Sequence, residues 1–124
     1  MWPADLPPCF HLVLSPGGGR PASACHRPLP RDRVVLLHGW NQSHVSWLRT
    51  AAVLRDRLGL EVLLLDFYNH GHSPTLPEWS AHCAETLVRQ VRALLLQLDW
   101  QDSRLTIAGV SLGGAVALHY FARW

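Results

Sequence analysis

The stretch "GVSLGG", residues 109–114, holds the side chain best placed to do chemistry, Ser111. A serine hydroxyl attacks carbonyl carbons when a sharp turn between a buried strand and a helix leaves it exposed. The apolar run "RLTIA" before the motif and the helical pattern "LGGAVALHYF" after it supply both elements. Glycines at 109 and 113 fit such a turn, because side chains there would collide with its neighbours. The pattern therefore predicts a serine nucleophile at an exposed turn.

Histidines near two other apolar runs raise a second possibility, a metal site. His38 follows the run "RVVLL", and His70 and His72 lie in the loop "DFYNHGHS" that contains Asp66. These four side chains are of types that ligate metals, but H-x-H in an irregular loop lacks the i, i+4 geometry of helical zinc ligands. We therefore expect no metal here.

The elements that must position these residues alternate in type from residue 33 onward. Apolar runs at 33–39, 61–67 and 104–109 are typical of strands buried on both faces. Helical periodicity follows each run, with the expected helices listed as 43–59, 80–98 and 112–124. Ser43 is the expected N-cap and Gly59 the expected C-terminal stop of the first helix. This order predicts an α/β fold, a doubly wound, mostly parallel sheet with helices on both faces. In such sheets the active groups gather at the carboxyl ends of the strands.

The first 32 residues differ in composition from the rest. They are rich in Pro and Gly, with "FHLVLS" as a possible strand and "PASACHRPLP" as a weak partner for a β-hairpin. We therefore divide the chain into a segment at 1–32 and an α/β domain at 33–124.

Composition excludes several function classes. The chain has 124 residues, of which 48% are hydrophobic and 16% charged, as in globular proteins. Its net charge of +2 and dispersed arginines predict no nucleic-acid partner. Three cysteines without C-x-x-C spacing argue against a disulfide framework. The N-terminus lacks the pattern of a secretory signal and no run approaches the length of a membrane span, so we expect a cytoplasmic protein.

Taken together, three motifs in order ("VVLLHGW" at 34–40, "DFYNHGHS" at 66–73 and "GVSLGG" at 109–114) resemble the N-terminal half of an α/β-hydrolase domain. The resemblance implies that Ser111 is the nucleophile, with the backbone N–H groups of Leu112 and Trp40 as the oxyanion hole. It implies no cofactor. The remaining motif residues would be structural: His38, Gly39, Asp66, Gly71, Ser73, Gly109 and Gly113. Trp40 could also line a substrate pocket. Asn69 stands where that family often has glycine.

The resemblance further implies hydrolysis of an ester, thioester or amide of a small molecule or lipid through an acyl-enzyme. A serine needs a histidine base and an acid to orient it, and in this family both follow the serine. After Ser111 the sequence has no Asp or Glu, and its one histidine, His119, lies about 12 Å along a helix. Two alternatives stay open: a non-catalytic α/β-hydrolase-like binding module, and a Rossmann-type nucleotide binder, which the missing G-x-G-x-x-G pattern disfavours.

The α/β-hydrolase resemblance also implies a sheet of about eight strands, of which this chain supplies at most five. We therefore expect the strand before Ser111 to be an exposed edge and the last helix to lack cover. Three explanations stay open: a fragment, a spliced or degenerate product, and a half-domain completed by another chain. Such a chain should be poorly soluble or molten by itself.

Overall fold

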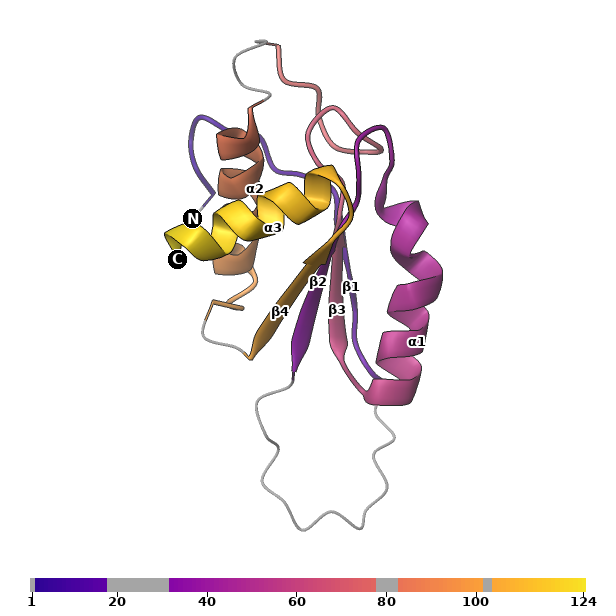
Figure 1. Ribbon diagram of the computed structural model, residues 1–124. Helices are drawn as coiled ribbons and strands as arrows, with labels where there is room; N and C mark the ends of the chain where they lie inside the picture. The colour runs from indigo at the N-terminus through magenta and orange to yellow at the C-terminus, as the bar shows by residue number, and fades with distance from the viewer. Residues whose placement is uncertain (1, 18–31, 78–82, 102–103) are drawn as a thin grey trace.

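Four strands form one mixed sheet in the computed structural model, which describes residues 2–17, 32–77, 83–101 and 104–124. Their order is β1-β3-β2-β4, with bounds His11–Leu14 (β1), Arg33–Leu37 (β2), Glu61–Leu65 (β3) and Leu105–Gly109 (β4). The pairs β2–β3 and β2–β4 are parallel, whereas β1 runs antiparallel to β3 (Figure 1). The predicted doubly wound, mostly parallel sheet is confirmed.

The first strand, β1, pairs with a strand far along the sequence: His11 lies opposite Leu65 and Leu14 opposite Val62. The second half of the expected hairpin, at 21–30, lies outside the described residues. The division of the chain at residue 32 stays a prediction.

Helices follow each of the three parallel strands, as predicted. The first begins as a 3₁₀ turn, η1 (His44–Trp47), and continues as α1 (Leu48–Leu58); the others are α2 (Ala84–Gln97) and α3 (Leu112–Arg123). The Ser43 hydroxyl accepts a hydrogen bond from Val45 N–H at 3.3 Å, as an N-cap does. Gly59 ends α1 in the left-handed conformation, at φ 67°. The expected first turn of α2, at 80–82, lies outside the described residues.

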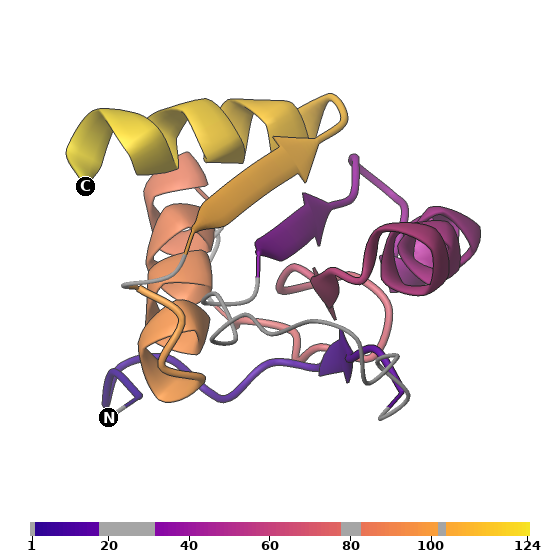
Figure 2. The same ribbon diagram turned by 90° about the horizontal axis from the view of Figure 1, so that it is seen from below.

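Two layers of helix enclose the sheet. Figure 2, seen from below, shows α1 on one side and α2 and α3 on the other. Alternate residues of β2 and β3 therefore face different cores: Val35, Leu37, Leu63 and Leu65 belong to the cluster under α2 and α3, whereas Val34, Leu36, Val62 and Leu64 belong to the cluster under α1. This two-sided burial explains why both strands are continuously apolar in sequence.

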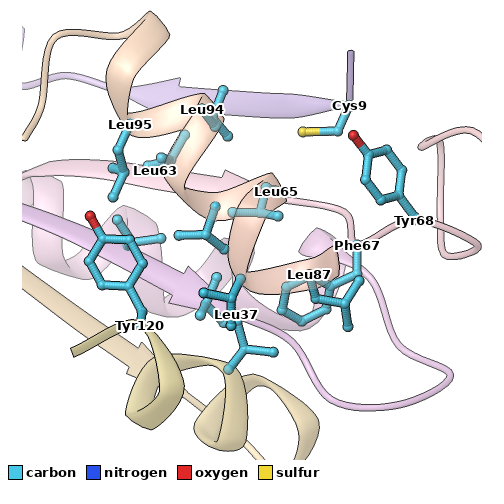
Figure 3. Packing of buried hydrophobic residues seen from close by; sticks show 14 of the residues in the cluster. Cys9, Leu37, Leu63, Leu65, Phe67, Tyr68, Leu87, Leu94, Leu95 and Tyr120 are labelled. Atoms are coloured by element: carbon cyan, nitrogen blue, oxygen red, sulfur yellow. The ribbon is translucent and has the colours of Figure 1, made fainter. Parts of the chain in front are cut away.

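The larger core lies between the sheet and α2. Leu94 and Leu95 of α2 are fully buried there, with Leu63 and Leu65 of β3 facing them (Figure 3). The N-terminal segment also contributes, because Cys9 is buried in this cluster beside the Tyr68 ring. Burial raises the pKa of Tyr68 to about 12, and its hydroxyl donates to Pro7 O at 2.5 Å.

The strand before the serine, β4, is an edge strand, as predicted: within the described residues it pairs with β2 alone. The helix that follows leaves apolar side chains in solvent, because Leu118 is 75% and Phe121 55% exposed, while Val116 is fully buried. No described helix combines the length and the hydropathy needed to cross a bilayer.

Candidate active site

The three predicted motifs meet at one end of the sheet. The loops after β2 and β3 and the turn into α3 all lie at the carboxyl ends of the parallel strands (Figure 1). Open α/β sheets bind their ligands at this edge.

Ser111 occupies a strained turn between β4 and α3. Its backbone has φ 52° and ψ −114°, which matches the first central position of a type II′ turn, where glycine dominates. The side chain is exposed at the N-terminal end of α3. A non-glycine residue kept in this conformation is a feature of functional sites, since it costs of order 1–3 kcal/mol.

Two glycines make this turn possible. A Cβ on Gly109 would come within 2.2 Å of the carbonyl carbon of Gly113, and a Cβ on Gly113 would come within 2.2 Å of the carbonyl oxygen of Leu37. Neither position can therefore carry a side chain without backbone movement. Val110 N–H also donates to Leu37 O at 3.2 Å. The serine turn is thus held directly against the end of β2.

Two backbone N–H groups near the turn are not used elsewhere. Among the hydrogen bonds of the described residues, none has the N–H of Leu112 or of Trp40 as donor. Leu112 is the first residue of α3, so its N–H lies at the positive end of the helix dipole. Both groups are free to donate to an anionic oxygen, the role that the α/β-hydrolase resemblance implies for them; that role stays a prediction.

His38 connects the ends of β2 and β3 from a fully buried position. Its Nε2 accepts from Phe67 N–H at 3.0 Å, and its Nδ1 donates to Gly39 O at 2.8 Å. Burial lowers the pKa of His38, a shift that the bond to Gly39 O opposes in part. The side chain of Gln42 completes this loop by accepting from Gly39 N–H at 3.0 Å.

Asp66, which directly follows β3, is a second fully buried polar residue that accepts several hydrogen bonds. Its carboxylate accepts from His44 N–H at 2.6 Å, from His44 Nδ1 at 2.9 Å and from His72 N–H at 2.9 Å. Burial alone would raise the pKa of Asp66, but these donors outweigh it and hold the pKa below its ordinary value. One carboxylate therefore joins the loop after β2 to the loop after β3.

The 66–73 loop needs special backbone conformations. Gly71 has φ 51°, and a Cβ there would lie 2.1 Å from Asp66 Oδ2. Asn69 has φ 65°, a conformation that asparagine tolerates better than most residues, which explains how it can replace a glycine. Ser73 ties the loop to the N-terminal segment, since its hydroxyl donates to Asp66 O at 2.6 Å and accepts from Phe10 N–H at 3.0 Å.

Sequence reasoning missed three polar residues that support these loops, His44, Gln42 and Gln90. Gln90 is fully buried, accepts from Tyr68 N–H at 3.2 Å and donates to Asp66 O at 2.8 Å. Its position in the apolar stripe of the predicted helix was a readable signal, because a buried amide needs partners. His44 and Gln42 carried no comparable signal in their spacing.

Among the described residues, no hydrogen bond joins a histidine ring to the Ser111 hydroxyl. Both ring nitrogens of His38 are engaged, and His119 is exposed on α3. His70 Nδ1 donates to Tyr68 O at 2.9 Å. In the described part of the chain no three His, Cys, Asp or Glu side chains converge as metal ligands would. A hollow of about 340 Å³ beside Asp32, Val34 and Arg104 lies at the amino ends of the strands, away from the serine.

Comparison with known proteins agrees with this geometry. A family model described as "alpha/beta hydrolase fold" matches residues 32–123. The chain belongs to the α/β-hydrolase fold family.

Similar proteins include enzymes with stated ester substrates. The chain is 34% identical over 90 residues to a pimeloyl-[acyl-carrier protein] methyl ester esterase of Chromobacterium violaceum, covering 73% of this chain and 31% of that protein. It is 30% identical over 90 residues to the AB hydrolase superfamily protein YisY of Bacillus subtilis, covering 73% and 32%. A solved enol-lactonase from Burkholderia xenovorans has the same fold, with TM-score 0.73 and 21% identity over 93% of this chain and 38% of that one. The chain thus spans about a third of the length of these proteins.

Proposed function

We propose that this chain carries the nucleophile and oxyanion-hole part of a serine hydrolase acting on an ester, thioester or amide. The observation that carries the proposal is the conformation of Ser111, an exposed serine at φ 52° and ψ −114° between two glycines that cannot be replaced without backbone movement. Strain at this single position fits a nucleophile lifted clear of the sheet. The esterase names among its relatives support the same class of substrate.

In the proposed reaction the Ser111 oxygen attacks the substrate carbonyl carbon while its proton passes to a base. The carbonyl oxygen becomes an anion and accepts hydrogen bonds from Leu112 N–H and Trp40 N–H. The leaving alcohol, thiol or amine departs with a proton, and water then hydrolyses the acyl-serine. The base and its orienting acid would come from polypeptide outside these 124 residues, in keeping with relatives about three times as long.

A second candidate function is binding without catalysis. It is favoured by the surroundings of Ser111 in the described part of the chain, because no hydrogen bond there joins a histidine ring to the serine hydroxyl. A serine without a base is a poor nucleophile. Such a protein would keep the fold and the free N–H groups, which can hold a carboxylate or another small anion.

Covalent labelling distinguishes the two functions. The chain, in the longest form that its transcript encodes, is treated with a fluorophosphonate, and the modified residue is located by mass spectrometry. The hydrolase function predicts labelling at Ser111 and its loss in Ser111→Ala, while Ser46→Ala, which removes another exposed serine, labels normally. Labelling that survives Ser111→Ala overturns the nucleophile assignment, and no labelling of a folded chain favours the binding module.

A further inference from the structure

The loop after β2 has a histidine whose proton position is fixed by its partners. Phe67 N–H can only donate, so His38 Nε2 is the acceptor of the 3.0 Å bond between them. Gly39 O can only accept, so His38 Nδ1 carries the proton of the 2.8 Å bond. His38 is therefore a neutral imidazole in one tautomer.

Gly39 O, which accepts the Nδ1 proton of His38, belongs to the same peptide unit as the free N–H of Trp40. Gly39 O and Trp40 N are joined by one trans peptide bond, whose C=O and N–H point in opposite directions. Gly39 O is held from one side by His38 Nδ1 at 2.8 Å and by Gln42 N–H at 3.2 Å. Fixing this carbonyl also fixes the direction of the Trp40 N–H.

We propose that His38 is a positioning residue that aims the Trp40 N–H toward the substrate oxygen through the shared Gly39–Trp40 peptide. The inference rests on the proposed function in one respect, since the direction of this N–H affects catalysis only if it donates to an oxyanion. Donors of this kind must be held in place before the reaction, and losing one costs roughly 10²–10³ in kcat.

The imidazole is itself held firmly. It is fully buried, with the Phe67 ring at 4.8 Å and the His70 ring at 5.1 Å between centroids. The Trp40 side chain is 70% exposed, and its ring packs edge-on against the His70 ring, with 5.4 Å between the centroids. The peptide that carries the donor is thus braced by the end of β3 as well as by its own loop.

This arrangement makes the donor sensitive to acid. A second proton on Nε2 would face Phe67 N–H and break that bond, so the cation does not fit the site. Burial lowers the pKa of His38; the nearby His70 and His44 act in the same direction, whereas the bond to Gly39 O and the Asp66 carboxylate act against it. The Trp40 N–H should therefore lose its fixed direction only below pH 6.5, the ordinary histidine value.

Two substitutions separate positioning of the Trp40 N–H from a purely structural role, in which His38 only joins the loop after β2 to Phe67. Asparagine reaches the place of Nδ1 and glutamine the place of Nε2, so His38→Asn keeps a donor for Gly39 O and His38→Gln keeps an acceptor for Phe67 N–H. Positioning predicts that the Trp40 backbone amide resonance, followed by ¹H–¹⁵N NMR, stays near its original shift in H38N and moves in H38Q. Fluorophosphonate labelling of Ser111 should fall by about tenfold in H38Q and by less than about threefold in H38N.

Imidazole ¹⁵N shifts of the unmodified chain test the premise without any activity. Positioning is supported by a proton on Nδ1 and by a titration midpoint of His38 below pH 6.5, provided that the Trp40 amide shift changes with the same midpoint. Three results would overturn it. The first is a proton on Nε2, and the second is a Trp40 amide shift that does not change as His38 titrates. The third is a Trp40 amide shift that matches the original chain in H38Q but not in H38N. If the Trp40 amide responds as expected while Ser111 never labels, positioning stands and the proposed hydrolase function fails.

Discussion

The carbonyl oxygen of Leu37 lies only 2.2 Å from where a Cβ on Gly113 would be. This contact seats the first turn of α3 on the last residue of β2. Because His38 follows Leu37 directly, the contact also sets Ser111 next to the loop that carries Trp40. A glycine two residues after the serine is therefore required by the contact between α3 and β2, and not by the turn alone.

Gly113→Ala should destabilise the chain by about 2 kcal/mol or more. Alanine normally stabilises a helix by about 1 kcal/mol over glycine, but here its Cβ would meet backbone atoms of β2, and overpacking of this kind costs roughly 1–3 kcal/mol or more. The free energy of unfolding, from urea titration followed by circular dichroism, measures the effect.

Gly114→Ala is the matched control, because a Cβ there has its nearest neighbour at 3.3 Å. We expect a change of less than about 1 kcal/mol, since the helical gain and the tight contact oppose each other. Equal effects of the two substitutions would show that the contact between Gly113 and Leu37 is not as close as described.

Ser111→Gly should stabilise the chain by about 1 kcal/mol while abolishing labelling, because glycine adopts φ 52° and ψ −114° without strain. Ser111→Ala removes the same hydroxyl but keeps the strain, so it should leave the free energy of unfolding nearly unchanged. Asn41→Gly, at φ 59°, serves as control and should gain less, since asparagine tolerates that region. A glycine variant no more stable than the alanine variant would refute strain at Ser111.

The serine turn and its neighbouring motifs could be predicted from sequence because their requirements are local. A buried strand, two glycines around a serine and a helical pattern lie within one continuous stretch, so periodicity and turn chemistry identify them. The edge position of β4 followed from the resemblance to a larger sheet.

Contacts between distant residues could not be predicted in the same way. The antiparallel pairing of β1 with β3 joins His11 to Leu65, and the bond between His44 and Asp66 joins two loops that only the folded sheet brings together. Backbone hydrogen bonds and single side-chain partners leave no periodic trace in the sequence. Gln90 is the exception, because a polar residue in an apolar helical stripe indicates a buried partner.

Asp66→Asn should destabilise the chain and make its free energy of unfolding depend less on pH in the acid range. The pKa of Asp66 is lowered on folding, so the carboxylate contributes stability that is fully present above its unfolded value of 3.8 and is lost as pH falls through the folded value. Removing the charge weakens three hydrogen bonds from His44 and His72, for a loss of about 2–3 kcal/mol at neutral pH. Urea titrations between pH 7 and the acid limit of folding measure both effects.

The control for this pH dependence is Asp56→Asn. Asp56 is an exposed carboxylate paired with Arg55 at 2.6 Å, and surface pairs contribute little. We expect its curve of stability against pH to follow that of the unmodified chain. A parallel curve for Asp66→Asn would mean that folding does not lower the pKa of the Asp66 carboxyl.

Charged substitutions on the exposed face of α3 should improve solubility without loss of stability. Leu118 and Phe121 are 75% and 55% exposed, and apolar side chains in this arrangement promote association. Leu118→Glu with Phe121→Glu should raise the monomer fraction in light scattering at increasing concentration, while the free energy of unfolding stays within about 1 kcal/mol. Val116→Glu places the same charge in a fully buried position two residues before Leu118, where an unpaired carboxylate opposes folding. Unchanged association in the double variant would contradict an exposed α3 face, and a folded Val116→Glu chain would contradict the packing of α3 on the sheet.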